Sequence, residues 1–99
     1  MRIGINSRKR LFDYLERDGY LRTSEVRNAM EEVNRENFVR TSDKYLAYDD
    51  TPLPIGQGQT ISAPHMVAMM LEQLNLKNTD KVVTTLPLSY TYGLYSRLS

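Results

Sequence analysis

The side chains of this sequence that could do chemistry gather just before and within the start of a predicted helix. Thr60 and Ser62 carry hydroxyls, His65 is the single histidine, and Asp49 and Asp50 lie shortly upstream. Hydroxyls and the unpaired N–H groups of a helix N-terminus are suited to holding an anion such as a carboxylate. The two aspartates have no evident partner for acid–base catalysis, so we interpret them as a solvated pair. These residue types are able to hold an anionic group, but by themselves they do not identify a function.

Composition excludes several other kinds of site. The 99 residues contain no cysteine and one histidine, which excludes a thiolate nucleophile, a disulfide and a cysteine-based or multi-histidine metal centre. Thirteen basic against twelve acidic residues give a net charge of +1, too little to bind nucleic acid by bulk charge. The longest apolar run, 66–71, is far below the roughly 20 residues of a membrane span. The N-terminus lacks the apolar core of a signal peptide. We therefore expect a soluble, cytoplasmic protein without metal.

Two helices are predicted at the start of the chain. The first runs from Arg8 to Asp18, with Ser7 as its N-cap and Gly19 as the left-handed residue that ends it. The second begins after Thr23 or Ser24. Its apolar residues recur at the spacing of one helix face, at Val26, Ala29, Met30 and Val33.

Shorter elements connect these helices to the chemical segment. Helical stretches are expected at 35–38 and 42–48, packing through Phe38, Val39, Tyr45, Leu46 and Tyr48. Prolines and glycines then predict an extended, turning loop over 49–59.

A third helix is predicted from Pro64 to Leu74, with Ser62 as its N-cap and Pro64 in its first turn. Because it is apolar on nearly every side over 66–71, it should be covered on more than one face. A turn at 77–80 and a strand at 81–86 are expected to follow.

The string from Pro52 to Glu72, PLPIGQGQTISAPHMVAMMLE, resembles a known family. It is similar to the substrate and cofactor loop, and the helix after it, of the protein-L-isoaspartate (D-aspartate) O-methyltransferases. Upstream, an Arg-x-x-Phe-Val stretch at 35–39 and a Tyr-x-x-Tyr-x-Asp stretch at 45–50 are also similar. Asn34 departs from the proline that the family often has there. The resemblance covers about residues 8–83.

The resemblance implies a doubly wound α/β fold, the Rossmann-like methyltransferase domain, preceded by helices. It also implies methyl transfer from S-adenosylmethionine to the free carboxyl of L-isoaspartyl (or D-aspartyl) residues in damaged proteins, a repair reaction. That carboxylate is ionised at pH 7, so catalysis would depend mostly on positioning.

The same resemblance assigns residues to roles. Ser62 matches the active-site serine. The cofactor would be bound by Thr60, Ile61, Ser62, Ala63 and His65. The isoaspartyl peptide would be bound by Ile55, Gly56, Thr60 and Ser62.

Each of these residues also has a simpler structural interpretation. Ser62 alone is typical of an N-cap, and His65 of a solvated residue in the first helical turn. Gly56 and Gly58 alone are typical of a turn. The methionines of 66–70 are typical of core packing. The functional interpretation therefore depends on the combined string.

The family pattern stops after Val83. Members carry a Glu/Asp-x-Gly-x-Gly-x-Gly turn that cradles the cofactor, whereas this chain has no glycine between Gly58 and Gly93. Pro87 and Leu88 cannot supply the close backbone approach and positive φ that glycine allows. No acidic residue follows that could hold the ribose hydroxyls.

We therefore expect an N-terminal portion of the enzyme, truncated and largely helical. Its parts would be a helical segment (1–50), the loop, helix and first strand (51–83), and a divergent tail (84–99) that has changed reading frame. The methionine face of the third helix should be exposed. Cofactor binding should be weak or absent, and the chain alone should be inactive.

Two other functions stay open. One is non-catalytic binding of isoaspartyl peptides through 55–65. The other is a small helical nucleic-acid-binding module, suggested by Arg8, Lys9, Arg10, Arg17, Arg22 and Arg27. Acidic side chains are interspersed with these, so a solvated face of mixed charge is the simpler interpretation. The expected partners are isoaspartyl proteins or peptides, with no nucleic acid and no membrane.

Overall fold

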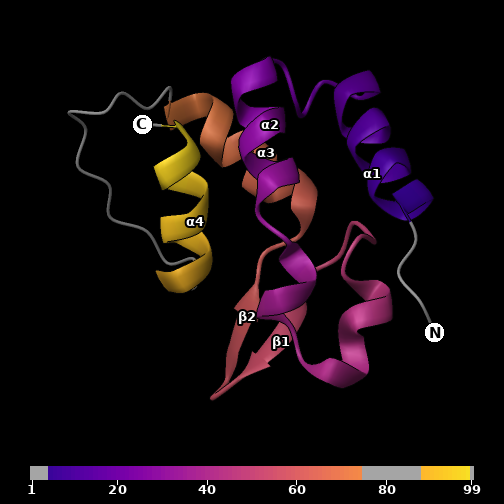
Figure 1. Cartoon of the computed structure of the whole chain (residues 1–99), viewed down its shortest axis with the longest axis vertical. Coiled ribbons are helices and arrows are strands. Elements are labelled where there is room, and N and C mark those ends of the chain that lie inside the picture. The colour runs from indigo at the N-terminus through magenta and orange to yellow at the C-terminus, as the bar shows by residue number, and fades with distance from the viewer. Residues whose placement is uncertain (1–4, 75–87, 99) are drawn as a thin grey trace.

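The computed structural model describes residues 5–74 and 88–98 (Figure 1). Its elements in chain order are α1 (Ile5–Arg17), α2 (Ser24–Glu32), the short 3₁₀ helices η1 (Arg35–Phe38) and η2 (Thr41–Leu46), β1 (Leu53–Gly56), β2 (Gln59–Ile61), α3 (Pro64–Leu74) and α4 (Leu88–Leu98). The α-helices lie together, and the β1–β2 hairpin forms one end of the molecule below α2. The expectation of a largely helical structure is confirmed.

The first helix ends as predicted but begins earlier. Gly19 has a φ of 84°. Its N–H donates to the Glu16 carbonyl at 3.1 Å, and the N–H of Tyr20 donates to the Leu15 carbonyl at 2.9 Å. These two bonds form a Schellman motif. Ser7 lies inside α1, so its prediction as an N-cap is wrong, because no proline or glycine after position 4 interrupts the helix.

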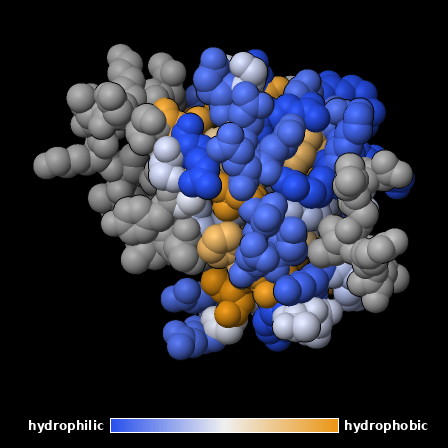
Figure 2. All heavy atoms as spheres, in the orientation of Figure 1, coloured by the Kyte–Doolittle hydropathy of each residue, from blue (hydrophilic) through white to orange (hydrophobic). Residues whose placement is uncertain are grey.

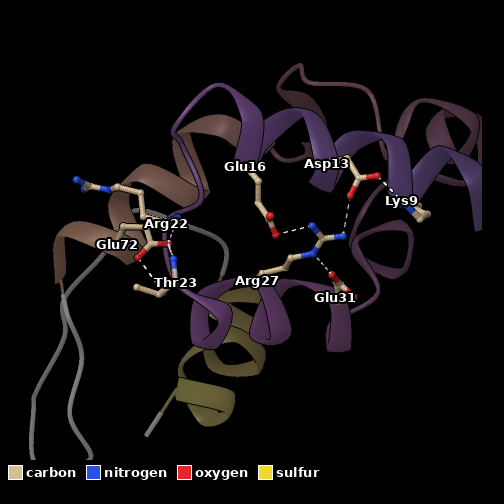
Figure 3. A network of polar contacts seen from close by, with 8 residues as sticks. All are labelled: Lys9, Asp13, Glu16, Arg22, Thr23, Arg27, Glu31 and Glu72. Atoms are coloured by element: carbon tan, nitrogen blue, oxygen red, sulfur yellow. Dashed lines mark hydrogen bonds and ion pairs between the residues drawn. The ribbon is translucent and has the colours of Figure 1, made fainter.

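The start of α2 is held by its own cap and by α3. The hydroxyl of Thr23 accepts from the N–H of Val26 at 3.3 Å, which confirms the predicted cap. Glu72 of α3 accepts from the N–H groups of Arg22 and Thr23, at 2.6 and 2.8 Å, and from the Thr23 hydroxyl at 2.9 Å (Figure 3). One carboxylate therefore fixes α3 against the first turn of α2.

The two short helices follow the sequence except at Tyr45. The stretch 35–38 is confirmed, whereas the second spans Thr41–Leu46 rather than 42–48. Tyr45 is 53% exposed, so its prediction as a packing residue is wrong. Side chains three apart share a face in a 3₁₀ helix, which places Tyr45 in line with the exposed Ser42. Tyr48, just beyond the helix, is buried as predicted.

The predicted loop over 49–59 contains most of a β-hairpin. Leu53 pairs with Ile61 and Pro54 with Thr60 in an antiparallel ladder. Gln57 and Gly58 connect the strands with φ values of 53° and 71°. Two consecutive residues with positive φ are typical of the tight turn that matches the twist of a hairpin. The prolines and glycines correctly marked the turn, but they concealed the two short strands beside it.

The core joins every α-helix to β2. The largest fully buried side chains include Leu15, Ile61, Val67, Leu71, Tyr90 and Leu94. Hydrophilic residues border a band of hydrophobic ones on the face shown in Figure 2. On α3, Met66 and Met69 are 43% and 36% exposed, which confirms the predicted exposed methionine face.

The last helix lies within the sequence expected to be a divergent tail. Residues 88–98 form α4, which packs on α2. A Cβ at Gly93 would lie 3.2 Å from Cγ1 of Val33, so the two helices approach closely there. The predicted turn at 77–80 and strand at 81–86 lie outside the described residues. Within the described residues, no helix is both long and apolar enough to span a bilayer.

Candidate functional site

The segment Thr60–His65 connects β2 to the first turn of α3. Ile61 is fully buried and Ala63 is 6% exposed, whereas Thr60 is exposed and Ser62 is half-buried. This alternation follows the period of an extended chain, in which successive side chains point to opposite faces. The two hydroxyl-bearing residues therefore lie on the accessible side, and the apolar residues anchor the segment to the core.

The predicted substrate residues Ile55 and Gly56 lie on the neighbouring strand. Gly56 is exposed, with a φ of 100°, and pairs with Gln59. Thr60 pairs with Pro54, so the hairpin brings Ile55, Gly56 and Thr60 together. Ser62, Ala63 and His65 follow in the connection to α3.

Asp50 performs the capping function that the sequence assigned to Ser62. Because α3 begins at Pro64, Ala63 is the N-cap residue, and its carbonyl accepts from the N–H of Val67 at 3.1 Å. Asp50 Oδ1 accepts from the N–H of His65 at 2.8 Å. The prediction of Ser62 as N-cap is therefore wrong, since the helix begins one residue later than that role requires. A carboxylate from 15 residues upstream takes the place of a local cap.

Asp50 also fixes the imidazole of His65. The Nδ1 atom of His65 lies 2.9 and 3.0 Å from the two carboxylate oxygens of Asp50. An ionised carboxylate only accepts, so Nδ1 is the donor. Tyr14 of α1 donates to the same carboxylate at 3.4 Å, and the ring of Tyr20 lies 5.2 Å from the imidazole, centroid to centroid. The interpretation of Asp50 as half of a solvated pair is wrong, while Asp49 is exposed.

Arg35 holds the other side of the segment. Its guanidinium donates to the Ser62 carbonyl at 2.8 Å and to the Thr51 carbonyl at 3.0 Å. The residue is 3% exposed, and burial lowers the pKa of the guanidinium. The two carbonyls flank the hairpin, one before β1 and one after β2. Arg35 therefore fixes both ends of the hairpin at once.

Sequence reasoning missed the roles of Asp50 and Arg35. It interpreted Asp50 as half of a solvated pair, and it used Arg35 only in the resemblance and in the helical stretch predicted at 35–38. For Asp50 the signal is indirect: α3 begins at Pro64, and the residue at its N-cap position, Ala63, has no side chain that can cap a helix. For Arg35 the contacts are with backbone carbonyls, which carry no sequence signature.

The candidate site residues do not line an enclosed cavity in the part of the chain that the structure describes. The side chains of Ile61 and Ala63 face the core, and Asp50 and Arg35 already use the N–H of His65 and the carbonyl of Ser62. A cavity of about 350 Å³ lies elsewhere, between α1 and α2, and is lined by Arg8, Lys9, Phe12, Arg27 and Glu31. In the part of the chain that the structure describes, no three His, Asp or Glu side chains are placed to bind a metal.

Comparison with known proteins identifies the family to which the chain belongs. The family described as protein-L-isoaspartate(D-aspartate) O-methyltransferase matches residues 6–85. The chain belongs to this family, which confirms the resemblance drawn from 8–83. The match ends before α4 begins.

Similar proteins have the same description. A protein-L-isoaspartate O-methyltransferase of Hyperthermus butylicus is 57% identical over 77 residues, which are 78% of this chain and 32% of that protein. One of Methanothermobacter thermautotrophicus is 51% identical over 79 residues, 80% of this chain and 36% of that protein. The chain thus spans about a third of the length of these relatives.

A solved structure shows the same fold over the shared part. It is a protein-L-isoaspartate O-methyltransferase of Plasmodium falciparum in complex with S-adenosyl-L-homocysteine. The TM-score is 0.58 at 39% identity, covering 68% of this chain and 29% of that one. The described residues therefore correspond to an incomplete Rossmann-like methyltransferase fold, as expected.

Proposed function

We propose that this chain provides the substrate-positioning part of a protein-L-isoaspartate O-methyltransferase. In this reaction a methyl group passes from S-adenosylmethionine to the free carboxyl of an L-isoaspartyl residue in a damaged protein. The observation that carries the proposal is the Thr60–His65 segment, held between Arg35 and Asp50 in a chain of this family. We place this repair function in the cytoplasm.

The accessible hydroxyls suit the carboxylate of the substrate. The isoaspartyl carboxylate is ionised at pH 7, so it accepts hydrogen bonds from hydroxyl groups. Because it is already ionised, it needs no base before it can attack a methyl group. Thr60 and Ser62 can each donate a hydroxyl, and Ser62 is the residue we assign to the active site. Ile55 and Gly56, across the hairpin, would contact the peptide on either side of the isoaspartyl residue. The chemical contribution of these residues is positioning.

S-adenosylmethionine would supply the electrophilic methyl group when bound. The residues that we assign to it are Thr60, Ile61, Ser62, Ala63 and His65. Ile61 and Ala63 could contribute only main-chain atoms, because their side chains are buried. No glycine follows Gly58 before Gly93, so the sequence lacks the cradle that such a ligand needs. The described residues fit one edge of the cofactor and not a whole site, and we propose that the chain alone transfers no methyl group.

A methylation assay tests this proposal. The chain is incubated with S-adenosylmethionine carrying a radiolabelled methyl group and an isoaspartyl peptide, with the complete relative from Hyperthermus butylicus as the positive control. We expect labelled ester from the relative and none above background from the chain. Robust labelling by the chain alone would contradict the proposal, because it would show that these residues are sufficient for methyl transfer.

Non-catalytic binding of isoaspartyl peptides is the second candidate function. Its supporting observation is that Thr60 is exposed and Ser62 is half-buried, while the Ser62 carbonyl is held by Arg35. Calorimetric titration with an isoaspartyl peptide and its normal aspartyl isomer would separate the two functions. Selective binding of the isoaspartyl form, lost in Ser62→Ala and retained in Ser42→Ala, would favour the binding function.

The charge distribution supports the absence of nucleic acid among the partners. Arg27 contacts Asp13, Glu16 and Glu31, and Lys9 contacts Asp13 at 2.8 Å (Figure 3). These cations on α1 and α2 are neutralised by acidic neighbours and do not form a free basic stripe.

A further inference from the structure

We propose that Arg35 is a positioning residue for the Thr60–His65 segment and that α4 supports it through Tyr90. The inference rests on the proposed function for the importance of that segment. It adds two residues to the site, one of which lies beyond the part of the chain that matches the family.

The guanidinium of Arg35 is placed as a bridge between main-chain atoms. One terminal nitrogen donates to the Ser62 carbonyl at 2.8 Å and the other to the Thr51 carbonyl at 3.0 Å. The planar fork of a guanidinium can make two such bonds in fixed directions, whereas the ammonium of lysine cannot reproduce that geometry. Arg35 therefore joins the two ends of the hairpin just outside its outermost strand pair, Leu53 and Ile61.

Burial of this charge is costly, which argues against a role in packing alone. Arg35 is 3% exposed. Moving a cation out of water is unfavourable unless hydrogen bonds compensate, and an apolar side chain of similar volume often packs at lower cost. What the guanidinium adds over an apolar residue is the direction of its two bonds to Thr51 and Ser62.

Tyr90 of α4 completes the surroundings of Arg35. Its hydroxyl lies near enough to the Arg35 guanidinium for that charge to act against the rise that burial causes in the pKa of Tyr90. Tyr90 is 2% exposed, and its ring lies 5.2 Å from that of Phe38, the last residue of η1, centroid to centroid. Burial raises the pKa of Tyr90, so the hydroxyl stays neutral beside the cation. α4 thus packs through Tyr90 on η1, the short helix from which Arg35 reaches the carbonyl of Ser62.

Hydrogen exchange of the full chain, read by mass spectrometry without cofactor or peptide, tests this role. The variants are Arg35→Lys, which keeps the charge and loses the fork, and Tyr90→Phe, which removes one hydroxyl. Tyr45→Phe is the matched control, because Tyr45 is 53% exposed. We expect exchange in 59–66 to become about tenfold faster in Arg35→Lys and about threefold faster in Tyr90→Phe, with α1 unchanged. The control should match the wild type.

Two results would overturn the proposal. If Arg35→Lys exchanges like the wild type, charge alone is sufficient and the bridge has no positioning role. If exchange rises equally in α1 and in 59–66, Arg35 contributes only to global stability. Should Arg35→Lys fail to fold, the exchange rate of 59–66 in Tyr90→Phe still tests the proposal, since this variant keeps the guanidinium and the aromatic ring. Exchange at the wild-type rate in Tyr90→Phe would then contradict it. The exchange experiment measures no methyl transfer. Its result therefore tests the role of Arg35 even if the methylation assay contradicts the proposed function.

Discussion

The α1–α2 pair and the junction between the hairpin and α3 use different forces. The helices meet over apolar side chains such as Leu15 and Met30, and the ion pairs around Arg27 lie at the surface above them. At the junction, Arg35 and Asp50 make directional polar contacts that are buried or half-buried.

The two regions therefore contribute differently: the helical pair mainly to stability, and the junction mainly to the position of the main chain. Apolar burial contributes most of the stability but tolerates small displacements, whereas a hydrogen bond to a particular carbonyl or N–H fixes a position. The part of the chain that we assign to substrate binding is the part fixed by such bonds. Substitutions in the two regions should therefore differ in how far their effects spread.

The largest effect is expected in the helical pair. Leu15→Ala should lower the free energy of unfolding by about 3 kcal/mol, because a fully buried leucine leaves a cavity. Leu74→Ala, at a position 42% exposed, is the control and should change little. Urea denaturation measures both. A loss confined to α1, with the junction still protected, would contradict a shared core.

A smaller and more local effect is expected at Asp50. Asp50→Ala should cost about 2 kcal/mol, since it removes charge-assisted bonds to the N–H and Nδ1 of His65. Asp49→Ala changes the neighbouring exposed carboxylate and is the matched control. Hydrogen exchange should show early opening at the start of α3. Equal loss in both variants would mean that charge near the helix, and not the contact, matters.

Glu72 tests the connection between the two regions. Glu72→Gln keeps one carbonyl oxygen and loses the charge that accepts from Arg22 and Thr23, so we expect a loss of about 1 kcal/mol. Thermal unfolding measures it. Glu25→Gln is the comparison, because it removes a negative charge from the first turn of α2, next to the residues that Glu72 contacts. If the two variants were indistinguishable, the Glu72 contacts would add nothing beyond long-range attraction.

The smallest effect is expected at Asp13, and only in acid. Hydrogen bonds from Lys9 and then Arg27 hold the pKa of Asp13 below its usual value. A carboxyl with a lower pKa in the folded state stabilises the protein above its unfolded pKa of about 3.9, and this contribution is lost as the pH falls through the folded value. The acid-side fall in melting temperature should therefore be shallower in Asp13→Asn. High salt should reduce the difference, because this contact is exposed.

The sequence predicted local structure well where one residue type decides it. Gly19 ends α1, Thr23 caps α2, and Pro64–Leu74 has the bounds expected from its first-turn proline. The family and its incomplete fold also followed from the string 52–72, because such a long irregular match carries more information than any single residue.

Contacts between distant residues could not be predicted. Ala63 shows that α3 lacks a local cap, but the sequence near Ser62 does not show that Asp50 takes that place or that Arg35 reaches the Ser62 carbonyl. The short strands of the hairpin were concealed by the prolines and glycines of 52–58, which are also typical of loops. The roles assigned to Thr60, Ile61, Ser62, Ala63 and His65 stay predictions.

Because His65 is the single histidine and is held by Asp50, its imidazole signals can be used to detect binding near the start of α3. A protein with one histidine gives one set of imidazole signals in its proton NMR spectrum, and here they arise at the first turn of α3, beside the ring of Tyr20. Ring currents from that tyrosine should displace them from their free-solution positions. Binding of a ligand to residues 60–65 can therefore be followed through the shifts of these signals, without isotopes, dyes or an enzymatic readout.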